Sequence, residues 1–198
     1  MSDDIYEHIT YGGFKFFTIA QIPELKNRVV TMNGVSKSYA MTGWRIGYAA
    51  GPKEIIKAIS KIQSQSTTNP SSISQAAAVE ALNGNQDFIS IRAKAFEERR
   101  DFVVNTLNSI NGIKCLKPDG AFYVFPSCKN LIGKKDINGK KIENDTDFVQ
   151  SLLENNGVAV VQGSAFGLEG YFRISYATSM DNLKRALKKI SDFCESLK

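Results

Sequence analysis

The sequence predicts an α/β protein that consists of two folded parts joined by a long helix. In the first 85 residues, short strand-like apolar runs alternate with helical patterns. A single helical pattern then covers residues 86–110, about 36 Å at roughly 1.5 Å per residue, and Asn111-Gly112 ends it. From Ile113 onward the chain changes to shorter strands and helices. We therefore expect one domain over residues 1–85, a connecting helix over 86–112 and a second domain over 113–198.

The first part should contain three strands and two helices. One strand ends near Asp3 and the chain turns after it, because Asp3 and Tyr6 would lie on opposite faces of a regular strand. Further strands are expected at residues 28–32 and 43–51. The helices are expected at residues 52–64, opened by a proline, and at 73–82, capped by a serine.

The second part should combine short strands with two amphipathic helices. Strands are expected at residues 120–125, 158–161 and 172–176, and a polar loop at 129–141. In the last strand, apolar residues alternate with Arg173 and Ser175, so the arginine should face away from the core. Asp145-Thr146 and Ser179 are expected to cap the two helices.

The composition is that of a soluble globular protein. The chain has 198 residues, of which 42% are hydrophobic and 23% charged, enough for one domain or for one domain and part of another. No apolar run approaches the ~20 residues of a membrane span, and the N-terminus lacks a signal-peptide pattern. We therefore expect a cytoplasmic protein that does not bind a membrane.

The reactive side chains argue against several kinds of site. Cys115, Cys128 and Cys194 are odd in number and form no CxxC pair, so we expect reduced, partly buried thiols and no zinc site. His8 is the only histidine, which makes a metal cluster or a Ser-His-Asp triad difficult to assemble. The net charge is +5, and many lysines are mixed with acids at residues 129–141 and along the last helix. We expect neither a metal nor a nucleic acid as a partner.

One stretch of the first part has residues that carbonyl chemistry needs. Lys37 follows the strand at 28–32 and an Asn33-Gly34 turn, at the strand's carboxyl end, where open α/β sheets bind ligands. A lysine amine attacks an aldehyde only when it loses its proton easily, through partial burial or a nearby cation such as Arg45. For a lysine taken alone, an ordinary solvated position is the more common alternative.

The whole stretch, residues 36–48, closely resembles a known signature. It reads Ser-Lys-Ser-Tyr-Ala-Met-Thr-Gly-Trp-Arg-Ile-Gly-Tyr. This string resembles the cofactor-lysine signature of class I aminotransferases, which are pyridoxal-phosphate enzymes, in the bacterial aspartate aminotransferase branch. Four further stretches resemble the same family in the same order: residues 2–9, 63–70, 118–123 and 172–177. The resemblance covers nearly all of this chain but only about the C-terminal half of the family's length.

The resemblance implies roles for five residues. Lys37 would form a Schiff base with pyridoxal 5'-phosphate and then move a proton between the substrate's α-carbon and the cofactor. Asp3 would keep the ring nitrogen protonated, and Tyr6 would hydrogen-bond the ring hydroxyl. Arg45 would bind the cofactor phosphate and Arg173 the substrate α-carboxylate, since a guanidinium fork suits both anions. The alternatives are a helix cap for Asp3, ordinary packing for Tyr6, and ion pairs for the two arginines.

The resemblance also implies the fold and the reaction. Residues 1–85 would be the C-terminal part of the family's large domain, with a partial, mainly parallel sheet, and residues 113–198 its α+β small domain. The expected reaction transfers an amino group between L-aspartate and 2-oxoglutarate, in a homodimer in which residues 66–69 approach the neighbouring subunit. The family's first half, with its phosphate loop and most strands, has no counterpart in this chain. We expect a fragment or a truncated relic, poorly stable before residue 110 and weakly active or inactive alone.

Three alternatives stay open. The first is a non-catalytic binding module derived from the fold. The second is an aminotransferase for prephenate or aromatic 2-oxo acids, because no cation for the side-chain carboxylate of aspartate can be placed in this chain. Nucleic-acid binding through the basic surface is the third, and it would show a steep dependence on salt.

Overall fold

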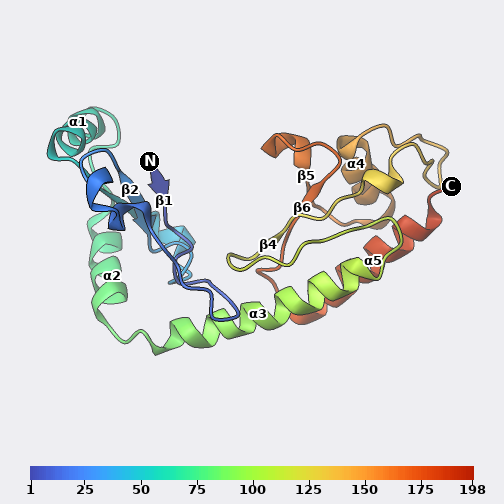
Figure 1. The fold of residues 1–198 in the computed structure, drawn as a ribbon, viewed down its shortest axis with the longest axis horizontal. Coiled ribbons are helices and arrows are strands. Elements are labelled where there is room, and N and C mark those ends of the chain that lie inside the picture. Colours follow the sequence, from blue (N-terminus) through green and yellow to red (C-terminus); the bar gives the residue numbers. More distant parts are fainter. The chain divides into compact units, whose positions relative to one another are not determined.

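The computed structural model describes all 198 residues, which form two compact units (Figure 1). Unit 1 comprises Met1–Ala93 and unit 2 comprises Lys94–Lys198. The boundary lies inside α3 (Asp87–Asn108), the long helix that the sequence predicts over residues 86–110. Each unit combines helices with a three-stranded sheet, in agreement with the predicted α/β class. The assignment of residues 1–85, 86–112 and 113–198 to domains stays a prediction.

The sheet of unit 1 has the strand order β1-β2-β3. β1 (Ser2–Asp3) runs parallel to β2 (Thr31–Gly34), and β2 runs antiparallel to β3 (Gly47–Ala50), so the sheet is mixed. The second strand begins at Thr31 instead of Arg28, because the Arg28 N–H donates to Leu25 O and closes a turn there. The third also begins later than expected, after a 3-10 turn at Thr42–Trp44.

The helices of unit 1 leave much of their apolar surface uncovered. α1 (Lys53–Ser64) and α2 (Ser72–Asn83) lie close to their expected positions. However, α1 has no buried residue, and every residue of β3 is exposed. The core cluster of this unit is small and consists of Val35, Ile46 and Ala78.

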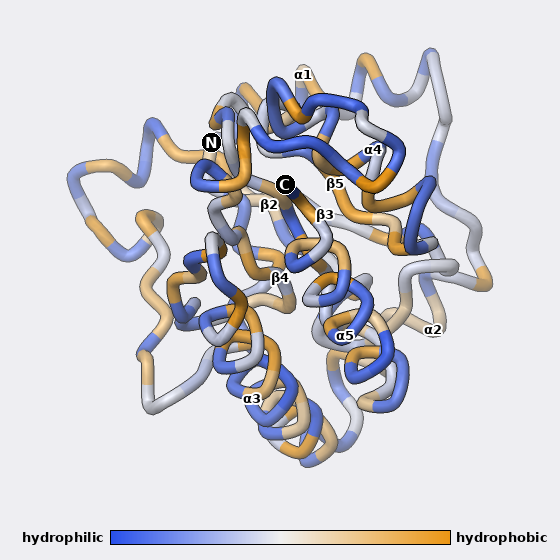
Figure 2. The backbone as a smooth tube through the Cα atoms, turned by 90° about the vertical axis from the view of Figure 1, so that its right-hand side faces the viewer, coloured by the Kyte–Doolittle hydropathy of each residue, from blue (hydrophilic) through white to orange (hydrophobic).

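Unit 2 has an antiparallel sheet in the order β4-β6-β5, formed by Tyr123–Val124, Phe172–Ser175 and Val161–Gln162. Two helices, α4 (Asp145–Asn156) and α5 (Met180–Ser196), contact each other. Phe148 of α4 lies with its ring centroid 5.1 Å from that of Phe172 and 5.3 Å from that of Phe193. Figure 2 shows hydrophobic and hydrophilic stretches alternating along α5, as in an amphipathic helix.

Three local predictions in unit 2 are wrong in detail. α4 is capped by Asn144, whose side chain accepts a hydrogen bond from the Asp147 N–H at 2.9 Å, and not by Asp145-Thr146. The strand expected at 120–125 is limited to β4, because Ala121 has a left-handed backbone with φ of 59°. The segment at 158–161 buries only Val158, and only its last residue joins a strand. The cap at Ser179 is confirmed.

The three thiols of unit 2 are free and fully buried, and not partly buried as the sequence suggested. Burial raises the pKa of Cys115 to about 11 and the pKa of Cys128 and of Cys194 to about 12, so all three are protonated near neutral pH. No group of three or more His, Cys, Asp or Glu side chains is arranged to hold a metal ion. None of the helices combines the length and the apolar composition that a membrane span needs.

Candidate functional site

In unit 1, three of the predicted site residues gather at one edge of the sheet. β1 and β2 are parallel, so their carboxyl ends meet at the same edge. Asp3 is the last residue of β1, and Lys37 follows the end of β2. The predicted turn after Asp3 is present, because the Glu7 N–H donates to Asp4 O at 2.9 Å. This turn brings Tyr6 to Lys37, whose Nζ lies 5.9 Å from the centroid of the tyrosine ring.

The loop that carries Lys37 is anchored by its neighbours. Val35 is fully buried and Ser38 is 5% exposed, whereas Lys37 itself is half-buried. The Ala40 N–H donates to Lys37 O at 3.1 Å, and Ala40 has a positive φ of 53°. A left-handed backbone at a residue other than glycine costs free energy, and such strain is concentrated at functional sites. The amine is thus carried by a tightly wound loop whose backbone is held on both sides.

Arg45 does not lie on a strand, as the sequence suggested, but just before β3. It has a left-handed backbone with φ of 56° and ψ of 45°, and its Nη1 donates to Thr42 O at 2.7 Å. The reason is the next residue, since Ile46 is buried in the core cluster and its carbonyl oxygen accepts from the Val35 N–H. The guanidinium is exposed, which leaves it able to bind an anion from solvent. Asp3 is also exposed, and its carboxylate accepts the Ile5 N–H at 3.3 Å.

A pair of residues that the sequence did not predict connects the two strand ends. Asn33 Nδ2 donates to Glu7 Oε1 at 2.6 Å, and Asn33 Oδ1 accepts the Gly34 N–H at 2.7 Å. Glu7 belongs to the turn that carries Tyr6, and Asn33 belongs to β2. The pair therefore ties the tyrosine turn to the strand that leads to the lysine loop. The only sequence signal was an acid in the same turn as a site residue.

The charge of Glu7 affects the pKa of two nearby tyrosines, Tyr39 and Tyr48. Burial raises the pKa of Tyr39 and of Tyr48 above the ordinary value, and the nearby carboxylate of Glu7 raises both further. Tyr48 lies opposite Asn33 in the pairing of β2 with β3. The Tyr39 hydroxyl donates to Gln86 Oε1 at 3.1 Å. The edge of the sheet is thus a polar environment with an acid, an amide and several phenols.

Arg173 lies in unit 2, on β6, and is half-buried. The preceding Phe172 is fully buried, whereas Arg173 and Ile174 are both partly exposed, so burial follows the expected alternation only in part. The guanidinium carbon Cζ of Arg173 lies over two aromatic rings, 4.5 Å from the centroid of Tyr123 and 4.4 Å from that of Phe166. The ion pairs of the chain all involve other residues.

The turn before Tyr123 is held by Tyr176, the residue that directly follows β6. The Tyr176 hydroxyl donates to Ala121 O at 3.1 Å, and the Tyr176 N–H donates to Phe122 O at 2.9 Å. Tyr176 is itself fully buried. These bonds stabilise the left-handed Ala121 and thereby the start of β4.

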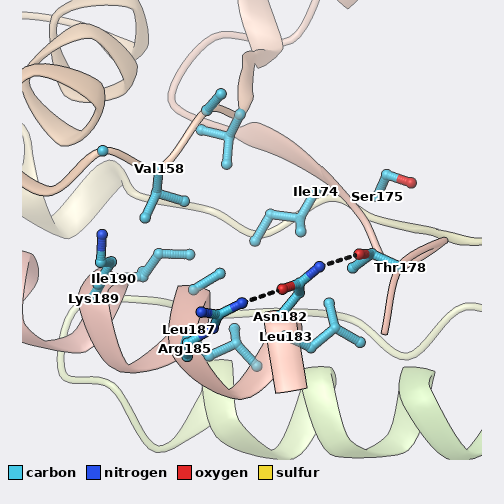
Figure 3. A pocket seen from close by; sticks show the side chains of 14 residues that line it. Val158, Ile174, Ser175, Thr178, Asn182, Leu183, Arg185, Leu187, Lys189 and Ile190 are labelled. Carbon is cyan, nitrogen blue, oxygen red and sulfur yellow. Dashed lines mark hydrogen bonds between the residues drawn. The ribbon is translucent and has the colours of Figure 1, made fainter. Parts of the chain in front are cut away.

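A pocket of about 430 Å³ lies elsewhere in unit 2 (Figure 3). It is lined by apolar side chains of α5 and β6 and by residues 157–160. At its side, Asn182 Nδ2 donates to Thr178 Oγ1 at 3.0 Å and Asn182 Oδ1 accepts from Arg185 Nη2 at 2.5 Å, as the dashed lines of Figure 3 show. None of the five predicted site residues lines it, so this pocket is not where the predicted chemistry would occur.

Comparison with known proteins places these residues in context. The model of the family described as Aminotransferase class I and II matches residues 1–190. The chain is 61% identical over 199 residues to the "Probable aspartate/prephenate aminotransferase" of Rhizobium leguminosarum bv. phaseoli, covering 100% of this chain and 50% of that protein. It is 60% identical over 196 residues to the "Aspartate aminotransferase" of Rhizobium meliloti (strain 1021), covering 98% of this chain and 48% of that protein.

The structural comparisons agree. The crystal structure of the aspartate aminotransferase from Rhizobium meliloti matches with a TM-score of 0.95 at 60% identity, over 98% of this chain and 49% of that chain. The aspartate aminotransferase of Thermotoga maritima matches with a TM-score of 0.84 at 38% identity, over 98% of this chain and 47% of that chain. The chain spans about half the length of the curated relatives it matches. The resemblance indicated by the sequence motifs, and its restriction to half of the family's length, are confirmed.

Proposed function

The chain belongs to the class I and II aminotransferases, and on that premise we propose that it is the lysine-bearing part of an aspartate aminotransferase. The proposed reaction moves an amino group between L-aspartate and 2-oxoglutarate. The observation that carries the proposal is the half-buried Lys37, whose Nζ lies 5.9 Å from the ring centroid of Tyr6 where β1 and β2 end. An amine held beside a phenol at the carboxyl edge of a sheet is suited to hold a carbonyl carbon and to move its proton.

The proposed cofactor is pyridoxal 5'-phosphate, and the residues of unit 1 fit it. When bound, it supplies an aldehyde for the amino group and a ring that accepts electrons from the substrate's α-carbon. Lys37 would hold the aldehyde carbon and carry the proton at the α-carbon. Asp3 would keep the ring nitrogen protonated, Tyr6 would donate a hydrogen bond to the ring oxygen, and Arg45 would bind the phosphate. Asp3 and Arg45 are exposed in this structure, so both side chains are accessible to such a ligand.

Arg173 is the proposed binding residue for the α-carboxylate of amino-acid and 2-oxo-acid substrates. A guanidinium offers two parallel N–H donors that match the two oxygens of a carboxylate. Both Rhizobium relatives bear the word aspartate in their names, which supports aspartate as the amino donor. The name of the Rhizobium leguminosarum relative also mentions prephenate, and an enzyme acting on prephenate is the second candidate.

A homodimer in the cytoplasm completes the proposal. Residues 66–69 are exposed throughout, as a loop that contacts a second subunit would be in a single chain. The buried free thiols of unit 2 are compatible with a reducing compartment.

The test measures the absorption spectrum after the cofactor is added to the purified chain. The mixture of wild-type protein and cofactor should show an absorption band that the separate spectra of protein and cofactor do not contain. Lys37→Ala should abolish this band. Lys61→Ala, which removes an exposed lysine on α1, should retain it. Added L-aspartate should change the band more than L-phenylalanine does. Turnover should stay weak, because half of the family's length is not in this chain. A band of equal strength in Lys37→Ala would contradict the assignment and favour a non-catalytic binding module.

A further inference from the structure

The guanidinium of Arg173 lies beside two aromatic rings. Its Cζ lies 4.5 Å from the ring centroid of Tyr123 and 4.4 Å from that of Phe166, so two aromatic rings contact one guanidinium. None of the ion pairs of the chain includes it. Rings attract a cation through their faces but take none of its N–H donors in the plane of the group. The two rings can therefore hold the guanidinium and leave its donors for an anion.

The register of the sheet places the first ring. Tyr123 lies directly opposite Ser175 in the antiparallel pairing of β4 with β6. Arg173 is two residues before Ser175 and so lies on the same face of the sheet, diagonal to the tyrosine. A diagonal neighbour on an antiparallel pair is within reach of a long side chain and an aromatic ring. The register thus brings the tyrosine ring within reach of the arginine, and the two side chains are in contact.

The second ring depends on a buried acid from another element. Phe166 ends the 3-10 turn Gly163–Phe166, and the Ser164 N–H in this turn donates to Asp145 Oδ2 at 2.6 Å. Asp145 is 1% exposed, so its carboxylate is fixed within the protein. A side chain added at Gly163 would meet Leu168 O at 2.3 Å and Tyr171 O at 2.8 Å, which shows how closely the turn is packed. Asp145 and the close packing at Gly163 therefore hold the turn that ends at Phe166, whose ring centroid also lies 5.9 Å from that of Phe125.

We propose that Tyr123 and Phe166 form an aromatic clamp that orients Arg173 toward a substrate carboxylate, and that Asp145 is the positioning residue for the Phe166 side of the clamp. The inference rests on the proposed function, which makes Arg173 the carboxylate-binding residue. A long arginine side chain otherwise samples many rotamers, and each must be lost when a carboxylate binds. The clamp removes this cost in advance, so its effect is on substrate affinity more than on the chemical step.

The first experiment observes the clamp directly in the full 198-residue chain by NMR of the Arg173 Nε–Hε group. Ring faces shift nearby protons to higher field, so Phe166→Leu and Tyr123→Leu should each move this signal toward the position of a free arginine. Tyr123→Phe keeps a ring and should restore the wild-type shift. The control is Phe102→Leu, which removes a half-buried ring on α3 in the same unit and should leave the Arg173 signal unchanged. An Arg173 Nε–Hε chemical shift that is the same in wild type and in both leucine variants would contradict the clamp.

The second experiment titrates succinate, a dicarboxylate without an amino group, and follows the same signal. The wild-type signal should respond, and each leucine variant should bind about two- to fivefold more weakly. Arg173→Lys lacks the observed group, so its succinate binding is measured by titration calorimetry and should be lost. If the wild-type signal does not respond to succinate, Arg173 does not bind carboxylates, and both the proposed function and the proposed clamp are wrong. If wild type responds and the leucine variants bind equally well, the proposed function stands and the clamp is wrong.

The role of Asp145 is tested by a graded pair of variants. Asp145→Asn keeps an oxygen that accepts the Ser164 N–H, whereas Asp145→Ala leaves this donor unsatisfied. We expect the asparagine variant to retain the Arg173 shift and succinate affinity, and the alanine variant to resemble Phe166→Leu in both. If Asp145→Ala fails to fold, Ser164→Pro removes the same N–H donor from the turn and should give the same result. A folded variant without this hydrogen bond that keeps the wild-type shift would contradict the positioning role.

Discussion

Unit 1 and unit 2 distribute their apolar side chains in different ways. Among the largest fully buried side chains of the protein, only Val35 belongs to unit 1, and all others belong to unit 2. In unit 1 three of the four isoleucines of α1 are exposed, with Ile55 at 43%, Ile59 at 42% and Ile62 at 72%. Parallel strands normally belong to sheets that are covered on both faces, whereas every residue of β3 in this mixed sheet is exposed. Unit 2 is stabilised by its own core, whereas unit 1 presents surfaces that its core does not cover.

The difference also separates two kinds of site. The proposed cofactor residues lie at the edge of the weakly covered sheet, with Asp3 and Arg45 exposed. Arg173 of unit 2 is half-buried and rests on two aromatic rings. The arginine should therefore be well ordered in this chain, while the cofactor residues depend on the stability of a small core.

The largest expected effect is the removal of a core ring from unit 2. Phe148→Ala deletes a fully buried side chain that packs between Phe172 and Phe193, and it should lower the free energy of unfolding by about 3–5 kcal/mol. Ile59→Ala on the exposed face of α1 should change it by less than about 0.5 kcal/mol. Urea unfolding, with hydrogen exchange of α5 and α1 peptides, measures both. If the two variants lose equal stability, the contrast between the units is wrong.

A smaller loss of stability is expected when glycine is replaced by alanine at a tightly packed position of unit 2, compared with an open position of unit 1. Gly163→Ala would place its Cβ 2.3 Å from Leu168 O, so the backbone of unit 2 must shift at a cost of about 1–3 kcal/mol. Gly43→Ala in unit 1 meets nothing within 4 Å and should be nearly neutral. Thermal unfolding of the two variants makes the comparison. Equal melting temperatures for Gly163→Ala and wild type would show that the turn before Phe166 is not tightly packed.

The smallest effect concerns the pH dependence of unit 1. Burial raises the pKa of Tyr39 and Tyr48, and the charge of Glu7 raises it further. These phenols therefore stabilise the folded state below about pH 10, the pKa of an unfolded tyrosine. This contribution to stability is lost as the pH rises through their pKa in the folded state. Glu7→Gln removes only the second cause, and ultraviolet titration should therefore show tyrosinate at lower pH than in wild type. Glu54→Gln, an exposed acid on α1, is the control and should leave the titration unchanged. An unchanged curve in Glu7→Gln would place its charge away from both phenols.

Local signals in the sequence predicted much of the fold. The helices near residues 53–64 and 87–108 follow from apolar periodicity. The helix near 72–83 follows from the proline and serines before it and from Asn83-Gly84 at its end, and the cap at Ser179 follows from the preference for serine at that position. The turn after Asp3 follows from the spacing of Asp3 and Tyr6, because one ligand can meet both only if the chain reverses.

What the sequence did not predict depends on contacts between distant residues. The left-handed backbone of Arg45 arises because Ile46 must enter the core next to Val35. The bond between Glu7 and Asn33 joins residues far apart in the chain, and no spacing rule indicates it. The rings over Arg173 come from two other elements, a strand and a turn, so strand periodicity gives the direction of the arginine but not its neighbours.

The central claim is that the amine of Lys37 is the group that holds the cofactor. The most direct measurement adds pyridoxal 5'-phosphate to the full chain, reduces the mixture with borohydride and maps the modified peptide by mass spectrometry. The account predicts that the pyridoxyl mass is found on the peptide containing Lys37, at low cofactor concentration and ahead of every other lysine. Modification spread evenly over the exposed lysines, with Lys37 unmodified, would contradict it.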